Sequence, residues 1–200
     1  MKAIYAFSAL VLLASCQSTT PPQNEQTASQ TVGSDSSRYF SIPFGNDLAG
    51  RGLKGAYEIY SDSTEQHFGH STLTIKSIKP EELASLTNNL KPEQCIGKRV
   101  EYTAWVKTKD VTGRAALWLR IDPADPHKPT LGFDNMRHRP IMGTQDWTVY
   151  HVVLDVPEGA ANMFYGALLH GDGQIWVDSM TVKIVDKSVP TTENLGRKTL

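Results

Sequence analysis

The stretch KRVEYTAWVKTKDVTGRAALWLRI, residues 98–121, decides the fold. It contains two runs in which apolar and polar residues alternate with a period of two, separated by Lys109–Gly113. Successive side chains of a β-strand point to opposite faces of a sheet, so each run predicts a strand with one buried face and the segment between them predicts a turn. The predicted buried residues are Val100, Tyr102, Ala104 and Val106 in the first strand and Leu117, Leu119 and Ile121 in the second.

The opposite faces of these two predicted strands carry tryptophans among charged residues. Trp105 shares its face with Glu101 and Lys107, and Trp118 shares its face with Arg120. On adjacent antiparallel strands the two indoles would lie side by side as an aromatic platform. A flat indole beside charged donors and acceptors suits the apolar C–H face and polar rim of a sugar. The alternative is that other side chains cover both tryptophans, since tryptophan is usually well buried.

The first fifteen residues have the layout of a secretory signal. Lys2 precedes an apolar run that is shorter than the ~20 residues of a membrane-spanning helix. The run ends in Leu13-Ala14-Ser15-Cys16, which resembles the bacterial lipoprotein signal. That resemblance implies cleavage before Cys16, acylation of its thiol (for example with palmitate) and attachment to a membrane of the cell envelope. Because Gln17 follows the cysteine, the outer membrane is expected if the host is Gram-negative. A plain signal peptide with an incidental Cys16 is the alternative.

Composition predicts the domain boundaries. We expect a signal peptide over 1–15, the lipidated cysteine and a flexible tether over 16–38, a folded domain over 39–186 and a frayed tail over 187–200. The tether is rich in Ser, Thr, Gln and Pro and has too few bulky apolar residues to offset its ordering entropy. The chain beyond it, about 160 residues, is enough for one domain with a core.

Further alternating runs in the domain predict more strands, over 56–60, 70–78, 147–156, 162–170 and 174–185. Turns are expected at Ser61–Ser63 and Gly171–Gly173. Pro and acidic residues at the start of Pro80–Leu86 place a possible short helix there. Many short strands with hardly any helix are typical of a β-sandwich or barrel. We therefore expect an all-β, antiparallel β-sandwich.

Several short motifs follow one another in an order that resembles a known superfamily. They are Gly97-Lys98-Arg99-Val100, Ala104-Trp105-Val106-Lys107, Leu117-Trp118-Leu119-Arg120, Phe133-Asp134-Asn135-Met136, Arg139-Pro140-Ile141, Asp146-Trp147, Val153-Leu154-Asp155-Val156-Pro157-Glu158 and Val177-Asp178. Over about Gly55–Val185 the chain is similar to the galactose-binding-like jelly rolls, including the carbohydrate-binding modules of bacterial glycosidases. The resemblance implies a jelly-roll β-sandwich and carbohydrate binding, although other members of the superfamily bind proteins or pack against a neighbouring domain.

A polar loop is the second candidate site. Asp134, Asn135 and Arg137 concentrate donors and acceptors in one connection, Asp134–Arg139, and polar loops on rigid scaffolds often bind ligands. The alternative is structural: Asp134 and Asn135 would hydrogen-bond the turn backbone, and the basic residues would be solvated.

Charge, cysteines and missing motifs limit the function classes. The formal net charge is −1 with both signs interspersed, which gives no sign of a nucleic-acid partner. Cys95 is expected to be a small buried hydrophobe. The sequence predicts no cofactor, although loop carboxylates could hold a structural calcium, with Asp122, Asp125 and Asp134 as one set and Asp172 and Asp178 as another. No catalytic motif is visible.

These observations leave three hypotheses. The first is a lipid-anchored envelope module that binds carbohydrate or a similar polar ligand at Trp105, Trp118 and the charged residues beside them, without catalysis. The second is a protein-interaction or envelope-structural module that uses the same face, because Trp and Arg are common interface anchors. The third is a small hydrolase that uses the Asp134–Arg139 loop.

Overall fold

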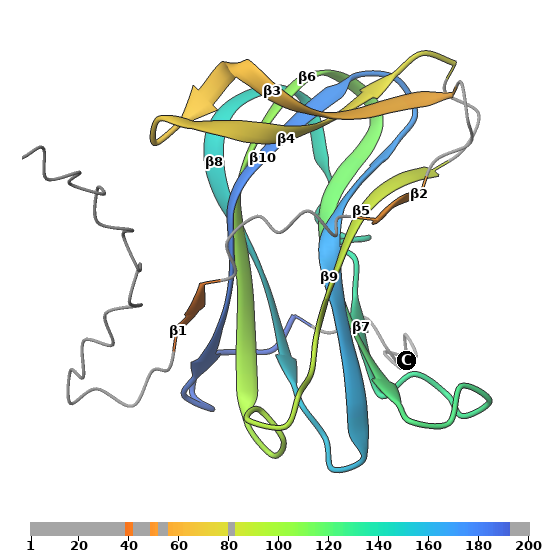
Figure 1. The fold of residues 1–200 in the computed structure, drawn as a ribbon, viewed down its shortest axis with the longest axis vertical. Helices are drawn as coiled ribbons and strands as arrows, with labels where there is room; N and C mark the ends of the chain where they lie inside the picture. Colours follow the sequence, from red (N-terminus) through yellow and green to blue (C-terminus); the bar gives the residue numbers. More distant parts are fainter. Residues whose placement is uncertain (1–38, 42–48, 52–55, 80–82, 193–200) are drawn as a thin grey trace, which may run out of the picture. The chain divides into compact units, whose positions relative to one another are not determined.

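A computed structural model describes residues 39–41, 49–51, 56–79 and 83–192 of the protein. All of them belong to the compact unit Ser36–Leu200, and the expected signal peptide and the tether up to residue 38 lie outside the described residues. Ten antiparallel strands occur in the described part (Figure 1). They are β1 (Tyr39–Ser41), β2 (Ala49–Arg51), β3 (Tyr57–His67), β4 (His70–Ser77), β5 (Leu83–Leu90), β6 (Arg99–Pro123), β7 (Gly132–Asp134), β8 (Ile141–Asp155), β9 (Ala160–His170) and β10 (Gln174–Val185). Within these residues no helix is long and apolar enough to span a bilayer.

Strand β6 joins two layers of a sandwich. Its first half pairs with β8 on one side and β10 on the other, and β10 continues to β4 and then β3. Its second half pairs with β7 and with β9, which continues to β5 and β2. We call these the first layer and the second layer. Figure 1 shows β6 beside β10, with the β3–β4 hairpin running across the other strands. The expected antiparallel β-sandwich is confirmed.

One hydrophobic core lies between the two layers. The predicted inward residues of both runs are buried, with Val100, Tyr102 and Ala104 fully so in the first half of β6, and Leu117 and Leu119 in the second. Burying one such side chain stabilises the fold by about 1.5–3 kcal/mol relative to leaving it exposed.

A tyrosine pair and a hydrogen bond tie the two layers together. The rings of Tyr102 on β6 and Tyr165 on β9 meet edge to face with centroids 5.1 Å apart. The Tyr102 hydroxyl donates to the Gly166 carbonyl across 3.2 Å. Burial raises the pKa of Tyr102 well above its ordinary value and that of Tyr165 to about 12, so both stay neutral. The pair is therefore a neutral, packed contact between layers.

Two local predictions are wrong. The turn expected at Ser61–Ser63 is a bulged part of β3, which pairs with β4 as far as His67 and shifts register between Asp62 and Gln66. The helix expected at Pro80–Leu86 is wrong from residue 83 onward, where β5 begins. Alternation along LASLTNNL explains this strand, because Ala84 and Leu86 are buried in the core while the residues between them face outward.

The tail expected to fray from residue 187 is held in place as far as Thr192. Arg99 donates to the carbonyls of Lys187 and Val189. Thr192 exchanges hydrogen bonds with the backbone of Val153 on β8. The prediction missed these contacts because it considered only local sequence, whereas the partners lie on β6 and β8. Residues 193–200 lie outside the described residues.

Candidate functional site

The two tryptophans do not form the expected platform. Trp105 and Trp118 lie on opposite halves of β6, and the two halves pair with other strands rather than with each other. Trp105 stands opposite Asp178 on β10, whereas Trp118 stands opposite Gly166 on β9. They therefore belong to two separate surfaces, one on each layer.

The error comes from a change of parity inside one strand. In β6 the outward side chains are odd-numbered before Thr108 and even-numbered from Arg114 onward. In a sequence, such a change of parity is typical of two strands joined by a turn. The structure produces the change with register shifts between Thr108 and Ala115 and with Asp110 at a φ of 53°. Such irregularities bend a strand and re-aim its side chains without ending it.

The outward face of the second layer forms a groove with Trp118 at its floor. The Trp118 indole Nε1 donates to the Ser85 hydroxyl on β5 across 3.0 Å, so the ring reaches over β9, which lies between the two strands. At that crossing β9 has Gly166, where a Cβ would lie 3.3 Å from the Trp118 Nε1 and 1.9 Å from the Leu86 carbonyl oxygen. The glycine thus permits the close approach of β5 and of the indole.

The groove encloses about 750 Å³ and has an aromatic centre with charged ends. Arg120 lies between Phe133 on β7 and Phe164 on β9, which are its register partners. The lining residues are Leu83, Ser85, Thr87, Arg114, Trp118, Arg120, Asp122, Phe133, Asn135, Phe164 and Leu168. Of the residues predicted for binding, the groove thus brings together Trp118, Arg120 and Asn135.

The first layer carries Trp105, Lys107 and Glu101 among the predicted residues, together with a separate aromatic cluster. The cluster consists of His67, Phe68, Trp105 and Trp147. The His67 ring lies 4.7 Å from the rings of both Trp105 and Trp147, measured between centroids. The tip of the β3–β4 hairpin supplies His67 and Phe68, and the Phe68 side chain is 65% exposed. Trp105 is therefore half-buried beneath a hairpin of its own chain.

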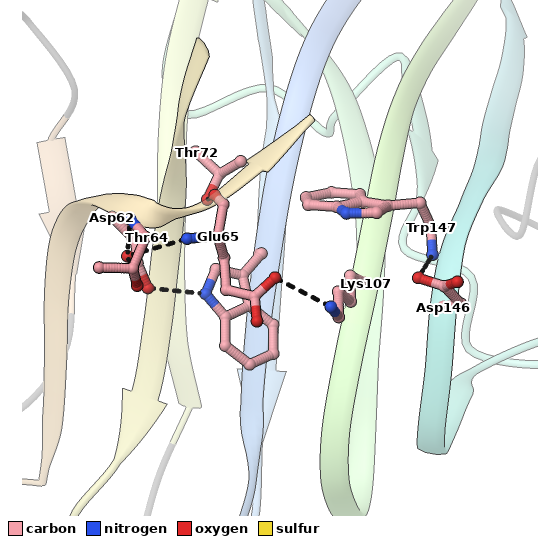
Figure 2. A network of polar contacts seen from close by, with 8 residues as sticks. Asp62, Thr64, Glu65, Thr72, Lys107, Asp146 and Trp147 are labelled. Carbon is pink, nitrogen blue, oxygen red and sulfur yellow. Dashed lines mark hydrogen bonds and ion pairs between the residues drawn. The ribbon is translucent and has the colours of Figure 1, made fainter. Parts of the chain in front are cut away.

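A polar network fastens the same hairpin to the layer (Figure 2). Asp62 accepts hydrogen bonds from the Thr64 hydroxyl and from the Trp176 indole, and these bonds lower the pKa of its carboxyl to about 2. Lys107 forms an ion pair with Glu65 at 2.9 Å. The Lys107 ammonium also lies over the Trp176 ring, 5.8 Å from its centroid. Lys107, a predicted ligand residue, is thus engaged within the fold.

Beneath the aromatic cluster lies a buried carboxylate. The Asp178 side chain is 2% exposed, and its Oδ2 lies 3.8 Å from the His67 Nδ1. Neither atom has a hydrogen-bond partner among the described residues. The other carboxylate oxygen, Oδ1, accepts from the Ser179 backbone N–H at 2.6 Å. The predicted Glu101 lies further along the same layer and pairs with Lys183 at 2.8 Å.

The Asp134–Arg139 loop is held together by its own side chains. Asp134 is fully buried and pairs with Arg139 at 2.7 Å. It also accepts from the backbone N–H of Met136, a buried residue at a φ of 54° whose sulfur accepts from the Leu117 N–H. Asn135 lines the groove, whereas Arg137 is exposed outside it. Asp134 thus bonds the turn backbone as the structural alternative expected, whereas Arg139 is paired with it rather than solvated. The roles predicted for Asp134 and Arg137 in binding stay predictions.

The carboxylates considered for calcium do not gather. In the described ranges, no group of three or more His, Cys, Asp or Glu side chains is placed to hold a metal ion. Asp122 pairs with Arg120, Asp125 accepts from the His127 N–H, and Asp134 is paired as described. Cys95 is buried as expected, and its burial raises the pKa of the thiol.

Sequence reasoning missed much of the groove. Ser85 lies in a segment considered for a helix, and neither Phe133 nor Phe164 was predicted to line a site, because nothing local links them to Trp118. Gly166 gave a usable signal, since a lone glycine inside a strand often marks the close approach of another group.

A curated protein is similar in sequence to part of the chain. No protein-family model matches the chain. An uncharacterized HTH-type transcriptional regulator of Bacillus subtilis (strain 168), YbfP, is 39% identical over 139 residues, which are 68% of this chain and 46% of that protein. The chain thus spans about half the length of the curated relative that it matches.

Among solved structures, similar folds occur in carbohydrate-binding modules. The CBM22-1 xylan-binding domain of Xyn10C from Paenibacillus barcinonensis has a TM-score of 0.51 at 15% identity, covering 75% of this chain and 93% of that one. The CBM22-1 and GH10 modules of xylanase 10B from Clostridium thermocellum give 0.52 at 10% identity, over 70% and 26% of the two chains. Tailspike protein 4 of bacteriophage CBA120 gives 0.51 at 14% identity, over 69% and 19%. At these identities the likeness shows the fold: the chain has the β-sandwich of carbohydrate-binding modules.

Proposed function

We propose that the domain binds carbohydrate in the groove of the second layer, without transforming it. The observation that carries the proposal is the Trp118 indole, fixed in the groove floor by its hydrogen bond to Ser85. A ring held in place stacks on the C–H face of a sugar with little further loss of side-chain freedom, and fixed contacts of this kind favour affinity.

The surroundings of Trp118 support the same ligand class. Phe133 and Phe164 add apolar surface, while Arg120 and Asp122 supply polar groups at the rim. A mostly apolar concavity with a few polar groups is typical of small-molecule sites, and about 750 Å³ falls within their usual range of roughly 300–1,000 Å³. The modules whose fold the chain shares include a xylan-binding domain, which favours polysaccharides as the first ligands to test.

Two tryptophan variants test the proposal. Trp118→Ala is expected to weaken binding on a glycan array and in titration calorimetry by roughly 10- to 100-fold, as for a central anchor residue. Trp105→Ala, on the other layer, is the matched control and should bind like the parent. Trp118→Phe should retain part of the affinity because it keeps a ring. Unchanged binding by Trp118→Ala, with an unchanged melting curve, would refute the groove as the site. Loss in Trp105→Ala alone would move the site to the aromatic cluster.

A second candidate function follows from the first layer. Phe68 is 65% exposed and Val149 is 50% exposed, and Val149 is the register partner of Trp105. Apolar and aromatic residues at one surface are typical anchors of a protein interface. Crosslinking in intact cells distinguishes the candidates: a single stoichiometric protein partner, lost in Phe68→Ser, together with no glycan retention, would favour a protein-interaction module.

We also propose that the protein is a lipoprotein of the cell envelope, anchored through Cys16. The sequence Leu13-Ala14-Ser15-Cys16 supports this, and these residues lie outside the described ones. Cells fed a clickable palmitate analogue should label the parent and place it in the membrane fraction. The Cys16→Ala variant should carry no label and leave that fraction. Equal labelling of both chains would contradict the anchor.

A further inference from the structure

We infer that the groove selects a carbohydrate that carries carboxylate groups, such as a uronic-acid glycan, and that Arg114 and Arg120 bind those groups. The inference rests on the proposed carbohydrate binding and adds a ligand class to it. It depends on three features of the groove: an arginine without a partner among the described residues, a second arginine that is only partly paired, and an excess of positive charge.

Arg114 is a cation that has no partner among the described residues. It lines one end of the groove, where it stands opposite His170 on β9. Its side chain is half-buried, and no hydrogen bond or ion pair joins its guanidinium to any of the described residues. A guanidinium is charged at every physiological pH and presents five N–H donors. A half-buried one therefore leaves strong donors available to a ligand.

Arg120 is held in position by one bond that leaves its outer nitrogens available. Its Nε donates to Asp122 Oδ1 across 2.8 Å, whereas its two terminal amino groups contact no acceptor in the described part of the chain. The side chain is half exposed, so the ion pair itself contributes little to stability. Its effect is to orient the guanidinium beside Phe133 and Phe164, its two register partners.

The charge balance of the groove favours an anion. Two arginines and one aspartate line it, which gives a local charge of +1 in a chain whose formal net charge is −1. The aspartate already faces Arg120, and the Ser85 hydroxyl already accepts from Trp118. Positive charge is thus in excess in the groove. The planar fork of an arginine matches a carboxylate through two parallel N–H···O bonds.

The spacing of these groups favours an extended glycan. Arg114 and Arg120 are six residues apart on β6, so their Cα atoms are about 20 Å apart at ~3.3 Å per residue. Trp118 lies between them on the same face. Only an extended ligand reaches both arginines and the indole. A uronic-acid polymer has both required groups, since each ring presents an apolar C–H face and a carboxylate.

Matched glycan pairs test the inference. The probes are polygalacturonate oligosaccharides with their methyl esters, and glucuronoxylan with its carboxyl-reduced form, measured by titration calorimetry at 50 and 300 mM salt. The parent is expected to bind the acidic member of at least one pair 10-fold or more tightly, with the difference shrinking at the higher salt as ionic contacts are screened. A further probe is a glycan without carboxylates that is made anionic by sulfation. If the parent prefers it over its unsulfated form to the same degree, any anion suffices and the selection of carboxylates is overturned.

Charge-removing variants locate the preference. Arg114→Gln is expected to abolish most of the acid preference while keeping binding of the neutral member, and Arg120→Gln should reduce it. Arg137→Gln is the matched control, because it removes the same charge from an exposed residue outside the groove. Equal binding of acidic and neutral glycans by the parent, or an unchanged preference in Arg114→Gln, would overturn this inference and leave the proposed function standing. A parent that retains no glycan of either kind would overturn both.

Discussion

Replacing Asp134 by alanine is expected to cost about 3 kcal/mol of unfolding free energy. The carboxylate is fully buried and accepts from two nitrogens of Arg139, at 2.7 and 3.3 Å, and from the Met136 backbone N–H at 2.8 Å. Removing one partner of a buried ion pair costs about 3–5 kcal/mol because the other charge is left uncompensated. Arg139 is 36% exposed, so water relieves part of this cost and the lower end applies.

The assay is urea unfolding followed by tryptophan fluorescence, supported by melting. About 3 kcal/mol corresponds to a fall in Tm of roughly 6–12 °C for a domain of this size. Asp155→Ala is the matched control. Asp155 also pairs with an arginine, Arg99 at 2.9 Å, but it is 50% exposed. Arg99 keeps the carbonyls of Lys187 and Val189 as acceptors when Asp155 is removed, so the loss should cost under about 1 kcal/mol. A loss below 1 kcal/mol for Asp134→Ala, or equal losses for both variants, would refute burial as the reason why the first pair matters.

Three further predictions concern single positions. Hydrogen bonds from Thr64 and Trp176 lower the pKa of Asp62 from 3.8 to about 2. The carboxylate's contribution to stability is therefore complete above pH 3.8 and is lost as the pH falls towards 2. Over that window the urea midpoint of the parent should drop more steeply than that of Asp62→Asn. The buried Cys95 thiol should react with a maleimide only after unfolding, which mass spectrometry of a Cys16→Ser chain would check. Gly166→Ala should cost about 1–3 kcal/mol by overpacking β9 against β5, together with loss of glycan retention, measured by melting and calorimetry.

The alternating faces of β6 were predictable because they follow from local chemistry. The inward residues of β6 were identified correctly in both halves, and β10 has the predicted bounds, Gln174–Val185. Connectivity was not predictable in the same way. A parity change between Thr108 and Arg114 has two solutions, a turn or a bulged continuation, and only the partners available on β8, β9 and β10 decide between them.

The groove shows the same limit for the candidate site. Trp118 and Arg120 were identified because they share a face of one strand, and that relation is local. Ser85, Phe133 and Phe164 join them only through pairings between distant segments. The aromatic cluster was hidden for a similar reason: His67 reaches Trp105 and Trp147 because a bulge carries the end of β3 across the layer.

The long shared strand also determines when a growing chain can fold. The first half of β6 needs β8 and β10 as neighbours and the second half needs β7 and β9, and all four are made after it. The second layer has all of its strands once β9 is made, but the first layer lacks β10 until Val185 has been synthesised. Folding of the first layer therefore cannot finish before its last strand is made, and the slow pairing of β10 with β6 and β4 comes last.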